Sequence, residues 1–200
     1  MFDNHRVSRF TCLVTLGLGL MAGSAFADDP AAPPPAGNEM MAGGKGSKII
    51  GVDVVGILPL GDYSNGASFG LGALARFEYG VSDVLAVTAR AGYIYNLGTP
   101  SGVGLAFIPV LVGATYKVGP PGLFVFGELG FTNIRVSVDV MGASGSDSQT
   151  KFSVGAGAGY QTGKIKARLG FFLPGSEDNG SSSTTFYGIM ASVGYDIAAL

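Results

Sequence analysis

Charged residues that recur on one side of alternating segments give the strongest chemical signal in this sequence. After residue 47, lysine, arginine and carboxylate side chains fall at positions that alternate with apolar ones. Such groups, if held together away from water, can pair with one another or can line a path for ions. The residues that we place on this inner side, as a lumen charge network, are Asp53, Arg76, Glu78, Arg90, Lys117, Glu128, Lys166, Arg168 and Asp196.

The balance of these charges bears on their role. Five cations stand against four anions, so nearly every charge can find a partner of opposite sign. This balance favours a structural plug of ion pairs, in which we expect Glu128 to pair with Arg76 or Arg90. The alternative is a narrow ion-conducting or gated channel, in which the same charges would select ions.

Catalytic chemistry has little support in the sequence. The single histidine and the single cysteine, His5 and Cys12, lie in a segment that we expect to be removed on export. The remaining chain therefore lacks the usual general base, the usual thiol nucleophile and the preferred zinc ligands. We predict no enzymatic activity, no catalytic residues, no cofactor and no metal site. The acidic cluster at 177–179 could touch calcium, but a solvated loop is the favoured interpretation.

The N-terminal segment indicates export. Arg6 and Arg9 precede a mainly apolar stretch at 12–21, and Ala25-Phe26-Ala27 forms an A-x-A cleavage site. Residues 28–46 are rich in proline and glycine, without side chains that could build a core. We therefore predict a signal peptide at 1–27, a periplasmic linker at 28–46 and one folded domain at 47–200.

Composition narrows the class of that domain. Apolar residues make up 47% of the chain and charged residues only 13%, and 34 of the 200 residues are glycine. No apolar run approaches the roughly 20 residues that a membrane-spanning helix needs. The weakly acidic balance also argues against a nucleic-acid partner, which would require a basic surface. A greasy, glycine-rich chain of this kind is typical of a membrane β-barrel.

Alternation with a period of two indicates β-strands. In the clearest example, residues 152–173, Phe152, Val154 and Leu169 belong to an apolar set, while Lys166 and Arg168 belong to the other set. The same pattern predicts eight strands, at 48–59, 68–79, 84–96, 104–117, 122–138, the two halves of 152–173, and 185–197.

The contents of the two faces decide which face meets lipid. A lysine or arginine on the lipid side of such a wall would cost about 2–4 kcal/mol at mid-depth, and all the charges within the expected membrane zone of these segments share the inner parity. We therefore predict an all-β, eight-stranded antiparallel up-and-down transmembrane barrel with an apolar exterior. A soluble lipocalin-like barrel, the structural alternative, would require the opposite arrangement.

The connections between the strands alternate in length. Those at 80–83, 118–122 and 161–164 are tight, whereas those rich in glycine, serine and aspartate, such as 141–150 and 174–185, are longer. Short periplasmic turns and longer outer loops are usual in outer-membrane barrels. Tyrosine prefers the water boundary of a membrane. We accordingly predict a periplasmic aromatic girdle of outward rings just before the tight turns and the C-terminus, namely Tyr79, Tyr116, Tyr160 and Tyr195.

Three segments, IPVLVGATYK at 108–117, GAGAGY at 155–160 and ASVGYDI at 191–197, resemble the small eight-stranded outer-membrane β-barrel family. Its best-known member is the N-terminal barrel of outer-membrane protein A, and the resemblance covers about residues 47–200. Two departures are the absence of a peptidoglycan-binding domain after the barrel and Leu200 at the end, where many relatives have an aromatic residue.

The resemblance implies a protein of the Gram-negative outer membrane that contacts lipid and lipopolysaccharide and is inserted by the outer-membrane assembly machinery. It implies a monomer whose outer loops could meet an extracellular ligand. From the sequence we therefore expect a non-enzymatic integral outer-membrane protein with a structural or surface-interaction role, its lumen plugged by charged side chains. A porin-like channel is the alternative.

Overall fold

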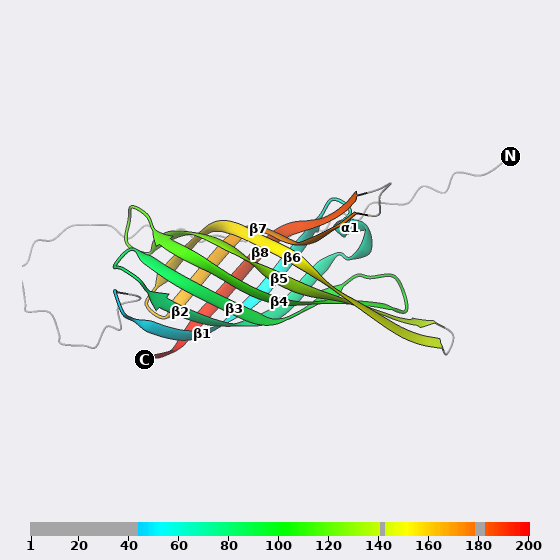
Figure 1. Cartoon of the computed structure of the whole chain (residues 1–200), viewed down its shortest axis with the longest axis horizontal. Helices are drawn as coiled ribbons and strands as arrows, with labels where there is room; N and C mark the ends of the chain where they lie inside the picture. Colours follow the sequence, from blue (N-terminus) through cyan, green and yellow to red (C-terminus); the bar gives the residue numbers. More distant parts are fainter. Residues whose placement is uncertain (1–43, 141–142, 179–182) are drawn as a thin grey trace, which may run out of the picture. The chain divides into compact units, whose positions relative to one another are not determined.

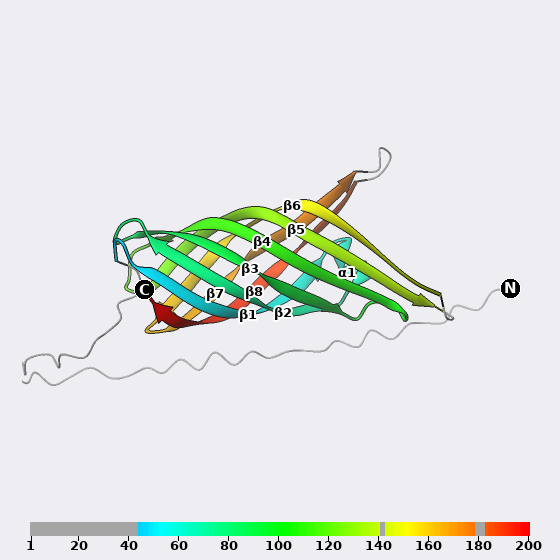
Figure 2. The ribbon, with the colours of Figure 1, turned by 60° about the horizontal axis from the view of Figure 1, so that its bottom comes forward.

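The computed structural model describes residues 44–140, 143–178 and 183–200, which form one closed β-barrel. Eight strands follow one another around the barrel in chain order, each antiparallel to its neighbours, and the first pairs with the last (Figures 1 and 2). This confirms the predicted fold class. The predicted signal peptide lies outside the described residues, as does all but the end of the predicted linker.

The strands are tilted and unequal in length (Figure 2). A short helix, α1 (Tyr63–Gly66), stands between the first two strands. No helix in the described part of the chain is long and apolar enough to cross a membrane. The strands are β1 (Lys48–Leu60), β2 (Phe69–Gly80), β3 (Leu85–Leu97), β4 (Val103–Lys117), β5 (Leu123–Val140), β6 (Ala143–Thr162), β7 (Ile165–Asp178) and β8 (Ser183–Ala199).

As predicted, the wall of the barrel turns its apolar side chains outward and its charged side chains inward. Large apolar side chains such as Val112, Leu129 and Phe171 keep 51%, 51% and 62% of their surface exposed. Arg76, one position from the outward Phe77, is only 1% exposed. Because successive strand residues point to opposite faces, this alternation leaves a continuous apolar exterior and turns the charged residues of the wall into the interior. An exterior of this kind suits acyl chains and not water.

The two ends of the barrel differ, and we call them the turn end and the loop end. At the turn end the connections are tight, and glycines in the left-handed backbone region close two of them, Gly122 (φ 90°) and Gly163 (φ 52°). The first and last strands meet there, where the Leu200 amide donates to the Lys48 carbonyl at 2.8 Å.

At the loop end two predicted loops are mainly strand. The β5–β6 ladder keeps one register from Leu123↔Tyr160 to Val140↔Ala143, whereas β6 pairs with β7 only from Val154↔Leu173. N-terminal to Val154, β6 is therefore paired with β5 alone, and the β5–β6 hairpin extends from the wall as an arm, residues 132–140 and 143–151, while β5 stays paired with β4 as far as Val138 (Figure 1). The expectation of connecting loops over 141–150 and 174–185 is wrong for most of these residues, because cross-strand pairing continues past the closed wall.

We expect Leu129→Arg to lower the free energy of unfolding by about 2–4 kcal/mol, since a charge would enter the apolar exterior at mid-strand. The measurement is urea unfolding in lipid vesicles. Ser101→Arg, in the exposed connection between β3 and β4, is the matched control and should change stability little. Equal effects of the two substitutions would contradict a lipid-facing wall at Leu129.

Candidate functional site: an ion-pair network in the barrel interior

The structure places eight of the nine predicted lumen charges inside the barrel. None of these eight residues exposes more than 8% of its surface. They come from six strands: Asp53 from β1, Arg76 and Glu78 from β2, Arg90 from β3, Glu128 from β5, Lys166 and Arg168 from β7, and Asp196 from β8. We call these eight residues the ion-pair network.

Lys117 departs from the expectation, because its side chain is exposed. It shares the inward parity of Thr115 but is the last residue of β4, at the rim of the turn end. An ammonium group at a rim keeps its hydration, which costs far less than burial. Alternation assigns a residue to a face but does not show where the closed interior ends.

Six residues of the network form a closed ring in which cations and anions alternate. From Asp53 the ring runs through Arg76, Glu78, Arg168, Glu128 and Arg90, and back to Asp53. The six N···O distances, in that order, are 2.9, 3.2, 3.2, 3.6, 3.1 and 3.0 Å. The Arg90–Glu128 contact is one of the two pairings that the sequence suggested for Glu128.

The ring crosses the lumen and does not follow the wall. Arg168 on β7 reaches Glu78 on β2 and Glu128 on β5, and Arg90 on β3 reaches Asp53 on β1. None of these strand pairs is adjacent in the barrel. The side chains therefore connect non-adjacent strands across the lumen.

Two further residues complete the charge balance. Lys166 donates to Glu78, and Asp196 accepts from Arg76 Nη2 at 2.7 Å. Gln161 Nε2 donates to the other oxygen of Asp196 at 3.1 Å. With these two branches the network has four cations and four anions. Burying single charges is very costly, so this balance is what makes so many buried charges tolerable.

Glycines on neighbouring strands make room for the network. A Cβ at Gly194 would lie 2.0 Å from Asp53 Oδ1, and one at Gly51 would lie 2.6 Å from Arg76 Nη2. A Cβ at Gly155 would lie 3.1 Å from Glu128 Oε1. The high glycine content is thus partly explained, because long charged side chains occupy the space that other side chains would need.

Aromatic rings flank the network toward the turn end. The guanidinium carbon of Arg168 lies 4.9 Å from the centroid of the Phe126 ring, and Lys166 Nζ lies 5.4 Å from that of Phe124. The electron-rich faces of these rings attract the cations. The sequence interpretation did not single out these two phenylalanines, although they share the inward parity of Glu128.

The loop-end half of the interior is apolar, which the sequence interpretation missed. Tyr63 of α1 folds into the barrel and is fully buried, and its ring centroid lies 5.5 Å from that of Phe107. Its hydroxyl donates to Asn96 Oδ1, and burial raises the pKa of this hydroxyl. The cluster around Tyr63, here called the apolar cap, comprises Val55, Ile57, Ala67, Leu74, Ile94, Leu105, Phe107, Leu111, Ile134, Phe172 and Met190.

The four tyrosines predicted to form a girdle point outward. Tyr79, Tyr116, Tyr160 and Tyr195 expose between 42% and 52% of their surface. Each lies near the turn end of its strand, on β2, β4, β6 and β8 respectively.

The buried carboxylates of the network are each engaged by a cation. No group of three or more potential metal ligands occurs in the described ranges.

Residues 46–188 match the model of the family described as "Putative MetA-pathway of phenol degradation". The match spans more than half of the chain. The chain belongs to this family.

Solved structures similar to this member of the phenol-degradation family are small outer-membrane barrels. Ail of Yersinia pestis has 14% identity and a TM-score of 0.58, with 78% of this chain and 99% of Ail covered. The N-terminal barrel of OprF from Pseudomonas aeruginosa has 16% identity and a TM-score of 0.52, with 77% and 99% covered. Neisserial surface protein A has 15% identity and a TM-score of 0.51, with 75% and 97% covered. A search of curated proteins finds no match.

These likenesses concern the fold, which is that of an eight-stranded outer-membrane barrel and confirms the resemblance found in the sequence. The apolar exterior described above has the character that location in an outer membrane requires.

For the network itself, we expect Glu128→Leu alone to lower the free energy of unfolding by about 3–5 kcal/mol, since the lumen would then hold four buried cations and only three buried anions. The double variant Arg90→Met/Glu128→Leu should cost less than Glu128→Leu, because the charges that remain are again balanced. Denaturant unfolding in vesicles measures both. If the double variant costs the sum of the two single substitutions, mutual charge compensation is not what stabilises this pair.

Proposed function

We propose that the protein is a non-enzymatic integral outer-membrane β-barrel with a structural or surface-interaction role. The observation that carries the proposal is the ring of ion pairs, which joins non-adjacent strands across the lumen. Above it the apolar cap fills the loop-end half with fully buried side chains, including Tyr63 and Phe107. A lumen occupied at both levels suits a rigid wall and not a conduit.

The proposal also assigns the membrane environment and the partners of the barrel. The exterior contacts lipid and lipopolysaccharide, the four outward tyrosines mark the periplasmic water boundary, and the chain works as a monomer inserted by the assembly machinery. Residues 1–27 direct export, and residues 28–46 form a periplasmic linker.

The outer arm and loops are the parts offered to the outside, where an extracellular ligand would bind. The description of the family refers to phenol degradation. In that setting a plugged barrel would handle an aromatic compound by binding it at the cell surface.

A narrow ion-conducting or gated channel is the alternative, and it requires the ion-pair network to open. Purified protein in planar bilayers should give no long-lived conductance steps. Heat-dependent gel mobility of the same sample verifies that the barrel is folded. Steps that occur in the native protein and disappear in Arg90→Ala, but persist in the exposed-arm variant Arg135→Ala, would establish the channel and overturn the plug.

A further inference from the structure

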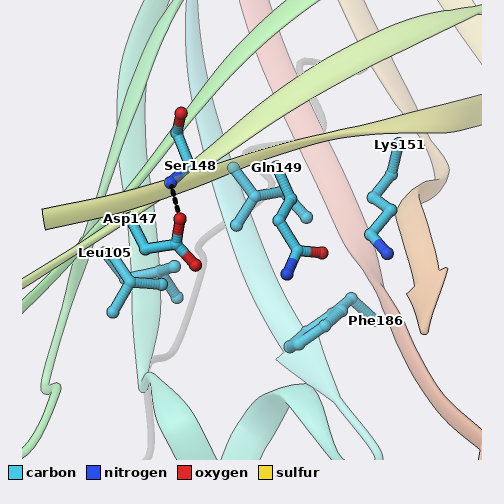
Figure 3. Close-up of a pocket in the computed structure, with 8 residues that line it drawn as sticks. Leu105, Asp147, Ser148, Gln149, Lys151 and Phe186 are labelled. Carbon is cyan, nitrogen blue, oxygen red and sulfur yellow. Dashed lines mark hydrogen bonds between the residues drawn. The ribbon is translucent and has the colours of Figure 1, made fainter. Parts of the chain in front are cut away.

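A small pocket opens at the loop end, above the apolar cap. It is lined by residues of four strands, β4, β5, β6 and β8, and has a volume of about 110 Å³. Its apolar side consists of Leu105, Ile134, Val136 and Phe186. Figure 3 shows Gln149 and Lys151 of β6 extending toward Phe186, and Gln149 is the cross-strand neighbour of Ile134.

The floor of the pocket is held by the packed interior. Leu105 and Ile134 are buried members of the apolar cap, and each exposes 8% of its surface. The ring centroid of Phe186 lies 5.9 Å from that of the buried Tyr63, in an edge-to-face contact. The apolar side is therefore formed before any ligand arrives, which lowers the entropic cost of binding.

The polar side is positioned by the arm and by β7. Asp147 Oδ1 accepts a hydrogen bond from the Ser148 amide at 2.8 Å (Figure 3). The backbone of β7 packs against the stem of Lys151, since a Cβ at Gly175 would lie 2.5 Å from Lys151 Cβ. Carboxylate, amide and ammonium groups are thus gathered along one side of an otherwise apolar hollow.

Size and polarity together define the ligand. A cavity of about 150 Å³ lined by leucine, isoleucine and phenylalanine is large enough to bind benzene, so this pocket has the scale of a single ring. Apolar lining with a few convergent polar groups is the usual character of small-molecule sites. We propose that the pocket binds a monocyclic aromatic molecule that carries a hydroxyl group, with the ring on Phe186, Ile134 and Leu105 and the hydroxyl facing Gln149 and Lys151.

This inference deepens the surface-interaction role proposed above but is independent of whether the lumen conducts. The pocket lies on the outer side of the apolar cap, and the ion-pair network lies on the other side. A ligand can therefore bind and leave without disturbing any ion pair. Conductance and ligand binding can each fail while the other holds.

The test uses the full chain in lipid nanodiscs, with methyl groups labelled for NMR and phenol as the probe. Phenol should shift the methyl signals of Leu105, Ile134 and Val136 in a saturable manner. The methyl signals of Val112 and Leu129, on the lipid-facing wall, should change only linearly as phenol partitions into lipid. A linear response of the pocket signals as well would overturn the proposal.

Variants then distinguish the pocket from its surroundings. Val136→Trp fills the hollow from an exposed strand position and should weaken phenol binding at least about tenfold, a difference of roughly 1.4 kcal/mol. Val138→Trp, two residues further along the arm and outside the pocket lining, is the matched control and should leave binding unchanged. Gln149→Trp, which fills the pocket from the neighbouring strand β6, is the second blocking variant. Unchanged binding in both blocking variants would refute the site.

Recognition of the hydroxyl group has its own control. Toluene matches phenol in size and lacks the hydroxyl, so phenol should saturate the pocket signals at a lower concentration. In the double variant Gln149→Leu/Lys151→Met that preference should disappear. Equal binding of the two compounds by the native protein would overturn the assigned role of the polar side.

Discussion

Charge neutrality inside a closed wall is the constraint on which this structure depends. A charged group buried in the lumen has no bulk water around it. Its counter-charge must therefore come from a side chain on another strand. The six residues of the ring meet this requirement together with Lys166 and Asp196. Their contacts join the strands across the lumen, in addition to the backbone pairing along the strand edges. The backbone ladder joins neighbouring strands, and the cross-lumen contacts also join strands that are not neighbours.

Two kinds of packing occur in the interior. Toward the turn end, cations meet carboxylates and aromatic faces, whereas toward the loop end apolar rings close around Tyr63. In the first half long side chains need space that glycines such as Gly194 leave free. Toward the loop end, helix α1, which lies between β1 and β2, contributes the ring of Tyr63 to the core. The membrane covers the outside of both halves with the same apolar surface.

Much of this could be predicted from the sequence, because a period of two assigns every strand residue to a face. That rule placed the charged residues inside and the apolar wall outside. It failed at Lys117, where the face is right but the strand has already reached the rim. It could not foresee Tyr63, because only the three-dimensional path of the connection brings that ring inward. Nor could it foresee which charges meet, since contacts across the lumen depend on register around the whole barrel.

The arm has a consequence for how the molecule behaves among its neighbours. Along Ala143–Ser153, β6 has β5 on one side, and in the described ranges no ladder pairs with it on the other. An unpaired strand edge can form backbone hydrogen bonds with a strand of another molecule. Natural proteins disfavour such association with charged and weakly β-forming residues at the edge. This edge is composed mainly of serine, glycine, aspartate and lysine. Its composition therefore disfavours aggregation through this edge.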